Sequence, residues 1–482
     1  MKPAITILVM LIAHALFGNT YYVSNNGDDS NGGLTPNDTF ETLQHASDVV
    51  VAGDSVMVSA GEYVGFYHET SGTENSYIVF HAESGVVISQ PNGTTNDGIN
   101  LEGASYIVVE GFTVIGVPRA GIRSVANEHV IIQNNTCSYN GKWGILTGFS
   151  ESITIRYNTC NYSIDEHGIY HGNSADYPII HGNICHDNNA NGIHMNADAS
   201  LGGDGIISFA TVTRNLIYNN GVAGGSGINC DGVQDSYIAN NLLYNNHASG
   251  ISLYQIDAAE PAHRNVVVNN TILQPDDGRW ALNITNGSSD VIVFNNILLS
   301  EHAFRGSISA DPVALETLIC DHNILADRLS ADDGETNISL NEWVSFTGLD
   351  GSSSVELADA LFIDPGVNNY QLSETSPAID GGLSSIATAN APFVDFENNA
   401  RPSGGIFDIG AYEYQVGEFI NETFQKQIQW SSLSPNDVVL IYSIQGQLVY
   451  EGFKSDFKPN NRSEALLFRS KIGNGFLPIG GE

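Results

Sequence analysis

The chain has 482 residues, 50 of them glycine, and its 17 Lys and Arg against 54 Asp and Glu give a formal net charge of −37. Nucleic acids and anionic membranes are bound through positive potential, so this charge excludes them as expected partners. The glycine content favours many short strands joined by tight turns, and the length allows several domains or one long solenoid.

Residues 1–19 have the pattern of a secretory signal peptide. One lysine precedes an apolar run of about a dozen residues, and small residues follow it. The run is too short for a confident membrane span, and no other stretch reaches transmembrane length. We therefore expect a secreted or cell-surface-anchored protein of an outer-membrane bacterium, without a transmembrane segment. A buried N-terminal strand is the alternative.

Residues 20–75 predict a strand, a glycine-rich loop, a short amphipathic helix and a second strand. This opening resembles the N-terminal cap and first coil of secreted right-handed β-helix proteins, which include several polysaccharide lyase families. The first coil of a solenoid exposes an unpaired sheet edge, and a cap covers it.

Residues 76–330 carry two repeats of nearly the same period, which indicates one coil of three short strands per repeat. The sequence therefore predicts an all-β, right-handed parallel β-helix of the pectin lyase-like kind. One repeat is an asparagine before an apolar residue, and the other is Gly-Ile. The asparagines are Asn135, Asn158, Asn183, Asn215, Asn241, Asn270, Asn296 and Asn323, and the glycines are Gly98, Gly121, Gly144, Gly168, Gly192, Gly227 and Gly250.

Three cysteines follow the asparagine repeat. Cys137, Cys160 and Cys185 each lie two residues after a repeat asparagine, so we expect them to stack inside the solenoid. Five cysteines are an odd number, which does not imply a disulfide framework, and buried free thiols are the favoured interpretation over disulfide or metal use.

The period fades after residue 330. Residues 331–416 include SPAID and DIGAYE segments and resemble the closing segment of secreted bacterial β-helix proteins, so we expect terminal coils with structural roles for Asp380, Asp408 and Glu413. Residues 417–482 resemble the small β-sandwich sorting domain of type IX secretion substrates. The usual ending of that domain is not recognisable here.

Side chains alternate between the two faces of a strand, so the Gly-Ile repeat predicts one outward strip. The isoleucines point inward, and the second and fourth residues after each glycine point outward. An insertion at 201–226 is expected to wall the strip, and Gly148 and Gly172 to leave room for a sugar ring. The outward strip contains Arg123, Tyr170, His194, Asn196, Asn229, Asp231 and Tyr254.

An elongated strip of aromatic, amide and charged groups suits a polysaccharide lying across the coils. Proton abstraction beside a uronate carboxylate needs a base, an acid and a cation that neutralises the carboxylate. We expect His194 or Tyr170 as the base and Arg123 as the carboxylate clamp. The remaining candidates are Asn196, Asn229, Tyr254 and Trp143 for substrate binding, and Asp198 and Asp231, with Asn196, for a calcium ion.

The resemblance to β-helix lyases adds a further base. Many of those enzymes use a lysine near calcium-binding aspartates, which implies Lys142, although the NGxExxRxGxS-type signature is absent. The DEH segment at 165–167 resembles the DPHE motif of β-helix mannuronan C5-epimerases without its proline. The expected function is a polysaccharide lyase or C5-epimerase acting as a monomer.

Two other functions stay open. A glycoside hydrolase would need two carboxylates, which Asp231 with Asp204 or Asp235 would supply. A non-catalytic glycan-binding or adhesion module would need only the aromatic and amide residues.

The remaining histidines have expected structural places. His171 should face the core, His181 and His186 should lie in turns, and the direction of His167 stays open. The HxxxH pair His167–His171 straddles the strand, which does not favour zinc.

Overall fold

The computed structural model of the protein describes residues 18–415, 438–443, 448–453, 466–470 and 473–477. The predicted signal peptide therefore lies almost entirely outside the described residues. Within them, no helix has the length and apolar character needed to cross a membrane.

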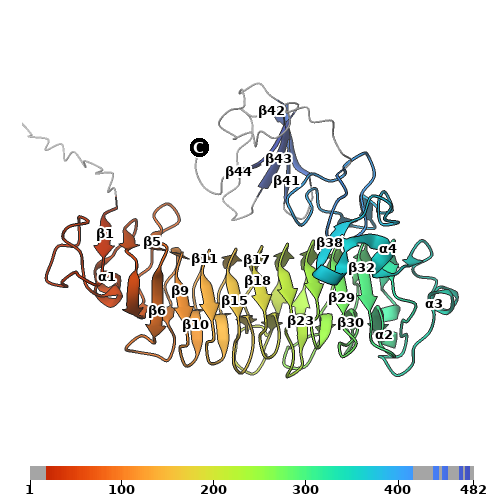
Figure 1. The fold of residues 1–482 in the computed structure, drawn as a ribbon, viewed down its shortest axis with the longest axis horizontal. Helices are drawn as coiled ribbons and strands as arrows, with labels where there is room; N and C mark the ends of the chain where they lie inside the picture. The colour runs from red at the N-terminus through yellow and green to blue at the C-terminus, as the bar shows by residue number, and fades with distance from the viewer. Residues whose placement is uncertain (1–17, 416–437, 444–447, 454–465, 471–472, 478–482) are drawn as a thin grey trace, which may run out of the picture.

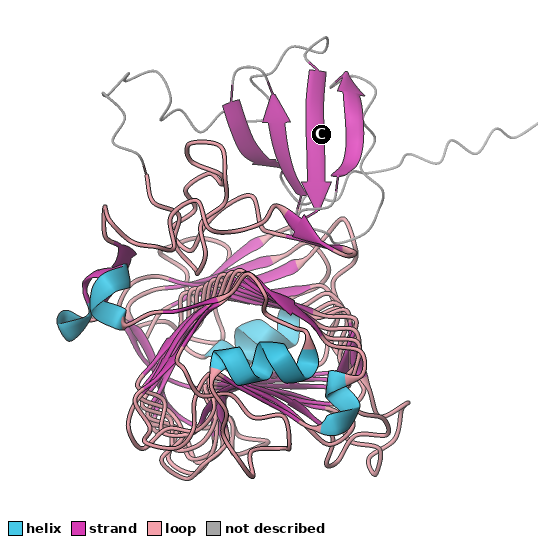
Figure 2. Cartoon of the chain, turned by 90° about the vertical axis from the view of Figure 1, so that its right-hand side faces the viewer, coloured by secondary structure: helices cyan, strands magenta, loops and turns pink. Residues whose placement is uncertain are grey.

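Three long parallel sheets run along the molecule and form the sides of one solenoid, as Figures 1 and 2 show. Successive strands of the chain enter successive sheets, so each coil contributes one strand to each side. This is the parallel β-helix that the two sequence repeats predict.

The first twelve-stranded sheet begins at the N-terminal cap. Its strands, in spatial order, are β1 (Thr20–Val23), β2 (Ser55–Val58), β5 (Ile78–Ala82), β8 (Ile107–Glu110), β11 (Ile131–Gln133), β14 (Thr154–Arg156), β17 (Ile179–His181), β21 (Thr211–Thr213), β25 (Tyr237–Ala239), β28 (Val266–Val268), β31 (Ile292–Phe294) and β34 (Ile319–Asp321).

The second twelve-stranded sheet carries the cysteines. Its strands are β3 (Gly61–Val64), β6 (Val86–Gln90), β9 (Thr113–Ile115), β12 (Thr136–Ser138), β15 (Thr159–Asn161), β18 (Ile184–His186), β22 (Leu216–Tyr218), β26 (Leu242–Tyr244), β29 (Thr271–Gln274), β32 (Ile297–Ser300), β35 (Ile324–Leu325) and β36 (Ser354–Val355). Cys137 pairs with Cys160 and Cys160 with Cys185, and all three are buried free thiols, as predicted.

The ten-stranded sheet carries the Gly-Ile repeat. Its strands are β4 (Phe66–His68), β7 (Ile99–Glu102), β10 (Ala120–Val125), β13 (Trp143–Gly148), β16 (Ile169–Gly172), β19 (Ile193–Asn196), β23 (Ser226–Asp231), β27 (Ser249–Tyr254), β30 (Leu282–Ile284) and β33 (Ile308–Ala310). The repeat isoleucines pair coil to coil and are fully buried, which confirms the predicted register.

The N-terminal cap has the predicted elements. Strand β1 pairs with β2, and the short helix α1 (Leu43–Val49) lies between them in the chain. The Thr42 side chain accepts a hydrogen bond from the His45 amide and so caps the helix. Leu43 and Ala46 of α1 are buried in the core, so the helix closes the first coil.

The C-terminal end of the solenoid contains short helices and antiparallel pairs. The helices are α2 (Pro312–Leu315), α3 (Leu340–Thr347), α4 (Ala358–Leu361) and the 3-10 helix η1 (Pro365–Val367). The strand pairs are β37 (Phe362–Asp364) with β38 (Asn369–Leu372), and β39 (Ser385–Ile386) with β40 (Ala389–Asn390). The last parallel strand is β36.

Strand β36 adds one more strand to the coils, as expected, but the segment that follows it, residues 362–413, does not continue them. It folds back and packs where the two twelve-stranded sheets meet: Asn295 donates to Leu383 O at 2.7 Å, and Asn269 donates to Asp408 O at 2.9 Å. Asp408 accepts the backbone N–H groups of Asp380 and Tyr414, and Glu413 lies 3.4 Å from the buried Arg401, which fits the structural roles predicted for these acidic residues.

The four described strands of the C-terminal region form one antiparallel sheet in the order β42 (Leu448–Phe453), β41 (Val438–Ser443), β43 (Leu466–Ser470) and β44 (Gly473–Leu477). The remaining small strand pair of the chain is β20 (Ile207–Ser208) with β24 (Val233–Gln234). A sorting role for residues 417–482 stays a prediction.

The asparagine repeat binds the coils together. Asn241 accepts the backbone N–H of Asn215 at 2.9 Å and donates to Val212 O at 2.9 Å and to Asn270 at 2.9 Å. The same pattern recurs along the repeat, so these residues satisfy buried backbone N–H groups at the turns between strands.

Removing one repeat amide should destabilise the protein strongly. Asn241→Ala leaves the buried Asn215 N–H without its partner and removes the bonds to Val212 and Asn270, so we expect a loss of about 3 kcal/mol in the free energy of unfolding. Denaturant unfolding measures the loss. Asn189→Ala, which removes one bond from a half-exposed amide, is the matched control and should cost under about 1 kcal/mol. Equal losses of stability in the two variants would refute the proposed role of the asparagine repeat in binding the coils together.

Candidate functional site

The outer face of the ten-stranded sheet has the register that the sequence predicts. Arg123, Leu146, Tyr170, His194 and Asn229 pair in one row from β10 to β23. A second row runs beside it. Gly148 pairs with Gly172, Gly172 with Asn196, Asn196 with Asp231, and Asp231 with Tyr254.

The first half of this strip is open to solvent, and beyond it Tyr254 alone of the predicted strip residues is partly exposed, which corrects the expectation of a groove over six coils. Arg123, Tyr170 and His194 are partly exposed, whereas Asn229 is 7% exposed and Asp231 1%. The loop after β27 covers Asp231, which accepts the backbone N–H groups of Ile256 and Asp257 at 2.8 Å each. The accessible face therefore lies between β10 and β19.

The expected insertion consists of two loops at opposite ends of neighbouring strands. Residues 197–206 follow β19, where Ser174 donates to Gly202 O and accepts from Gly205 N. Residues 219–225 precede β23 and place Gly225 beside Asn191. Both loops thus flank the covered half of the sheet.

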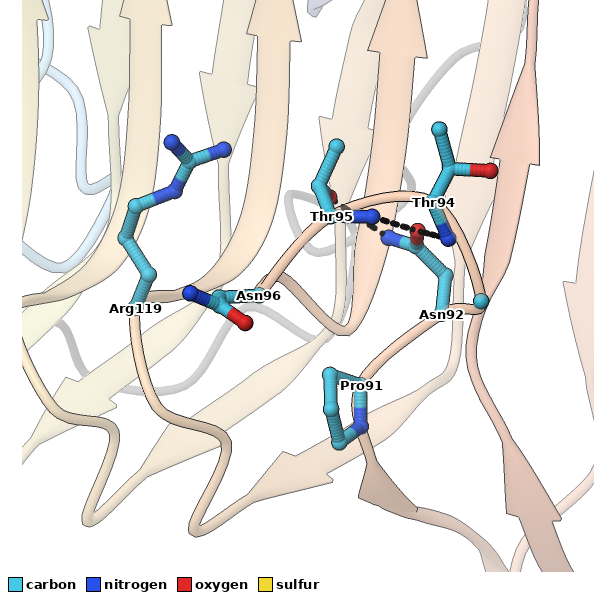
Figure 3. Close-up of a pocket in the computed structure, with 7 residues that line it drawn as sticks. Pro91, Asn92, Thr94, Thr95, Asn96 and Arg119 are labelled. Carbon is cyan, nitrogen blue, oxygen red and sulfur yellow. Dashed lines mark hydrogen bonds between the residues drawn. The ribbon is translucent and has the colours of Figure 1, made fainter.

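Two arginines lie at the N-terminal end of the accessible face. Arg119 forms a two-point ion pair with Asp97 beside a pocket of about 430 Å³ lined by residues 91–96, drawn in Figure 3. Arg123, one of the predicted candidates, pairs with Glu102 and donates to Asn100 at 2.9 Å. Each arginine therefore already has a carboxylate partner.

Lys142 lies on the next coil, at the edge of the sheet. Its Nζ is 3.0 Å from Glu166 Oε1 and 5.2 Å from the centre of the Trp143 ring, and its side chain is 45% exposed. Trp143 stacks on Tyr170 with ring centres 5.7 Å apart. The structure thus brings the predicted Lys142, Trp143 and Tyr170 into one cluster.

The Tyr170 ring occupies the space that was expected for a sugar. A Cβ added to Gly172 would lie 2.7 Å from the Tyr170 ring, so glycine is needed there because tyrosine lies flat over it. The amide of Asn173 fills the corresponding space at Gly148. Asn196 donates to the Tyr170 hydroxyl at 3.1 Å, and burial raises the pKa of Tyr170, so the phenol stays protonated at neutral pH.

His167 points outward beside His194, which the sequence left open. The backbone N–H and the amide of Asn191 both lie within hydrogen-bond distance of His167 Nδ1, at 3.3 and 3.2 Å. His167 Nδ1 therefore holds a lone pair, and its Nε2–H donates to His194 Nδ1 at 3.0 Å. The proton of the neutral His194 ring must then sit on Nε2.

Burial keeps both rings neutral. It lowers the pKa of His167 to about 3, and it lowers the pKa of His194 well below its usual range, with repulsion from His167 adding to the effect. His194 Nε2 is enclosed and has no hydrogen-bond partner among the described residues. In this state the Nε2–H of His194 meets no acceptor among the described residues, and the lone pair on Nδ1 is taken by His167.

The other histidines have structural places. His171 faces the core as predicted, between Thr147 Oγ1 at 2.7 Å and Ala175 O at 3.0 Å. His181 and His186 are the last residues of β17 and β18, so the expectation that they lie in turns is wrong. Their rings pack on the outside of the solenoid, where His186 stacks on Tyr218.

The acidic candidate residues already have hydrogen-bond or ion-pair partners among the described residues. Asp198 accepts from the N–H and hydroxyl of Ser200, and Asp235 forms a two-point pair with Arg264. Asp231 uses both carboxylate oxygens for backbone N–H groups, so it fits neither an open calcium site nor a hydrolase pair. The calcium ion stays a prediction.

Sequence reasoning missed three residues of this cluster, namely Arg119, Glu166 and His167. Their positions in the sequence could have indicated them. Each lies one or two residues before a repeat glycine, as Lys142 and Trp143 also do.

The comparisons agree with this architecture. A family model described as the right-handed β-helix region matches residues 76–205 and 144–306. The fold is thus an all-β right-handed parallel β-helix of the pectate lyase-like kind. A search of curated proteins gives no match.

Two solved structures share the fold over most of both chains. The crystal structure of the pectate lyase Pel9A is similar with a TM-score of 0.55 at 16% identity, covering 82% of this chain and 96% of that one. The complex of XylC with xylose is similar with a TM-score of 0.51 at 12% identity, covering 82% and 99%. At these identities the likeness shows the fold alone.

Proposed function

We propose that this protein acts on a uronate-containing polysaccharide by abstracting the C5 proton, as a lyase or C5-epimerase, on the open half of the ten-stranded sheet. The observation that carries the proposal is the placement of cations. Arg119 and Arg123 lie on one coil at this face and Lys142 lies on the next, in a chain whose net charge is −37. Three cations on one face of an otherwise acidic chain favour a substrate that carries carboxylates.

Lys142 is the base that the geometry favours. His194 holds its lone pair toward His167, and the raised pKa of Tyr170 keeps the phenol protonated. Lys142 is half exposed at the edge of the face, where its Nζ lies beside Glu166, and it would act as the base in its deprotonated form. Tyr170, whose hydroxyl oxygen accepts from Asn196, keeps its own proton free to donate to a leaving oxygen.

A glycan-binding protein without turnover is the second candidate. It is favoured by one observation: each of the three cations already pairs with a carboxylate of the chain. On such a surface, carboxylates of an acidic glycan would replace the chain's own carboxylates as partners of the three cations, and no base would be needed.

Ultraviolet absorbance at 235 nm separates the two candidates. The mature protein would be incubated with alginate, pectate, chondroitin and ulvan, with and without calcium. A rise with one substrate shows elimination, because the product has a conjugated double bond. A flat trace together with proton exchange at C5 in deuterated water shows epimerisation. Binding without either signal would refute proton abstraction and leave the binding protein.

A further inference from the structure

A second surface of the solenoid carries an aromatic stack that the proposed function does not use. It follows the corner where the second twelve-stranded sheet turns toward the ten-stranded sheet. Tyr139 and Tyr162 are turn residues on adjacent coils, and their rings stack with centres 4.6 Å apart and planes within 6°. His186, Tyr218 and Tyr244 extend the stack along the next coils, with His186 edge-on to Tyr162.

A groove of about 650 Å³ runs along this corner, and we call it the corner groove. Its apolar lining is well exposed: Tyr139 50%, Tyr162 38%, Ile164 60% and Val222 74%. Polar side chains face the same groove. Asp187 accepts from Asn219 at 3.3 Å and lies 2.6 Å from His186, so its carboxylate is held in place.

Tyr139 ends the stack and has one open ring face. The residue at the same turn position one coil earlier is Gly116, because Ile115 pairs with Ser138. A Cβ built on Gly116 meets no atom within 4 Å. The absence of a side chain there leaves the space above the Tyr139 ring open for a flat ligand.

We propose that the corner groove binds a neutral glycan chain, with one sugar ring stacked on the open face of Tyr139. Sugars present apolar C–H faces to aromatic rings and hydroxyls to carboxylates and amides, and the groove offers both kinds of group. No lysine or arginine of the described residues lines it, and Asp187 repels anions, so the ligand is a neutral sugar rather than a uronate.

The corner groove adjoins the open face of the ten-stranded sheet. Tyr139 lies three residues before Lys142, and Tyr162 lies four residues before Glu166. A neutral segment or branch held in the groove would thus keep an attached acidic segment near Lys142. The binding itself does not rest on the proposed function.

Calorimetric titration of the mature protein with cellohexaose, mannohexaose and xylohexaose tests the proposal, with a galacturonate hexamer as the charged probe. At least one neutral hexamer should bind. Tyr139→Ala should weaken that binding about tenfold or more, whereas Tyr139→Phe, which keeps the ring, should bind as the parent does. Gly116→Tyr should abolish binding with Tyr139 intact, because a new ring would close the open face.

Tyr157→Ala is the matched control. Tyr157 has the same 50% exposure and a left-handed turn conformation (φ 55°, against 54° for Tyr139), but it lies outside the corner groove. Binding that Tyr139→Ala and Tyr157→Ala weaken equally would overturn the proposal. The proposal would also be overturned if none of the three neutral hexamers bound at about 10 mM, near the weak limit of specific recognition. A surface that docks a protein instead of a glycan would give this absence of binding.

Lys142→Ala should leave the binding of neutral hexamers unchanged. A failure of glycan binding in the corner groove is therefore distinct from a failure of the proposed activity on uronates.

Discussion

Lys142→Ala is expected to lower kcat on the uronate polysaccharide about a thousandfold or more while changing KM less than about fivefold. Loss of a positioned base costs about two to four orders of magnitude in rate. The two arginines on the preceding coil remain in this variant and still bind the substrate carboxylates. Initial rates of absorbance change at 235 nm across a range of substrate concentrations give both parameters.

Lys142→Arg separates a base from a simple cation. Arginine keeps the positive charge beside Glu166 and over the Trp143 ring, but it stays protonated at any working pH. If Lys142 is the base, Lys142→Arg should be as inactive as Lys142→Ala. Recovery of more than about a tenth of the parental rate in Lys142→Arg would show that Lys142 only holds a carboxylate.

Arg123 offers a contrasting expectation within the same cluster. A residue that binds the substrate carboxylate before and during reaction contributes to KM as well as to kcat. Arg123→Ala should therefore raise KM, unlike Lys142→Ala. The two variants together distinguish the base from the clamp by the parameter that each changes.

The fold could be predicted from the sequence because every coil of a solenoid must meet the same packing and hydrogen-bonding requirements. A coil must bury one isoleucine and satisfy its turn amides in the same way as its neighbours, so Gly-Ile and Asn recur with one period. The pairing of Ile99 with Ile122 and the amide bonds of Asn241 follow from that requirement. The inward and outward rows were correct because the period of a strand is two.

The closing segment could not be predicted, because its contacts are not periodic. Residues 362–413 pack on turn asparagines such as Asn269 and Asn295. Nothing in the sequence distinguishes these asparagines from other turn residues, so their contacts with the closing segment are seen only in the structure. The resemblance to closing segments indicated its place in the sequence and not its path in space.

The candidate site was predicted in part for a similar reason. Tyr170, His194 and Lys142 lie on the predicted face, yet their roles depend on neighbours that the repeat does not specify. His167 fixes the proton position of His194, and the loop after β27 buries Asp231. Both effects come from residues outside the strand pattern, where alternation gives no direction.

The largest expected effect on stability is acid sensitivity caused by buried neutral histidines. Burial lowers the pKa of His171 from 6.5 to about 4, and His68, His167, His181 and His194 are shifted in the same direction. Each binds a proton more readily unfolded than folded, so its stabilising contribution is complete above pH 6.5 and is lost as pH falls toward the folded pKa. For His171 alone this loss is about 3 kcal/mol by pH 4.

His171→Gln tests this expectation at the core position between Thr147 and Ala175. The free energy of unfolding, measured by denaturant titration at several pH values from 7.5 to 4.5, should fall less steeply in the variant. The slope between pH 6 and 5 should decrease by about 1 kcal/mol per pH unit, because one fewer proton is taken up on unfolding. His45→Gln, a half-exposed position on α1, should keep the parental slope. The variant will be less stable than the parent at pH 7.5, so the comparison rests on the slopes. Parallel curves for His171→Gln and the parent would show that the core tolerates a charged His171 in spite of its burial.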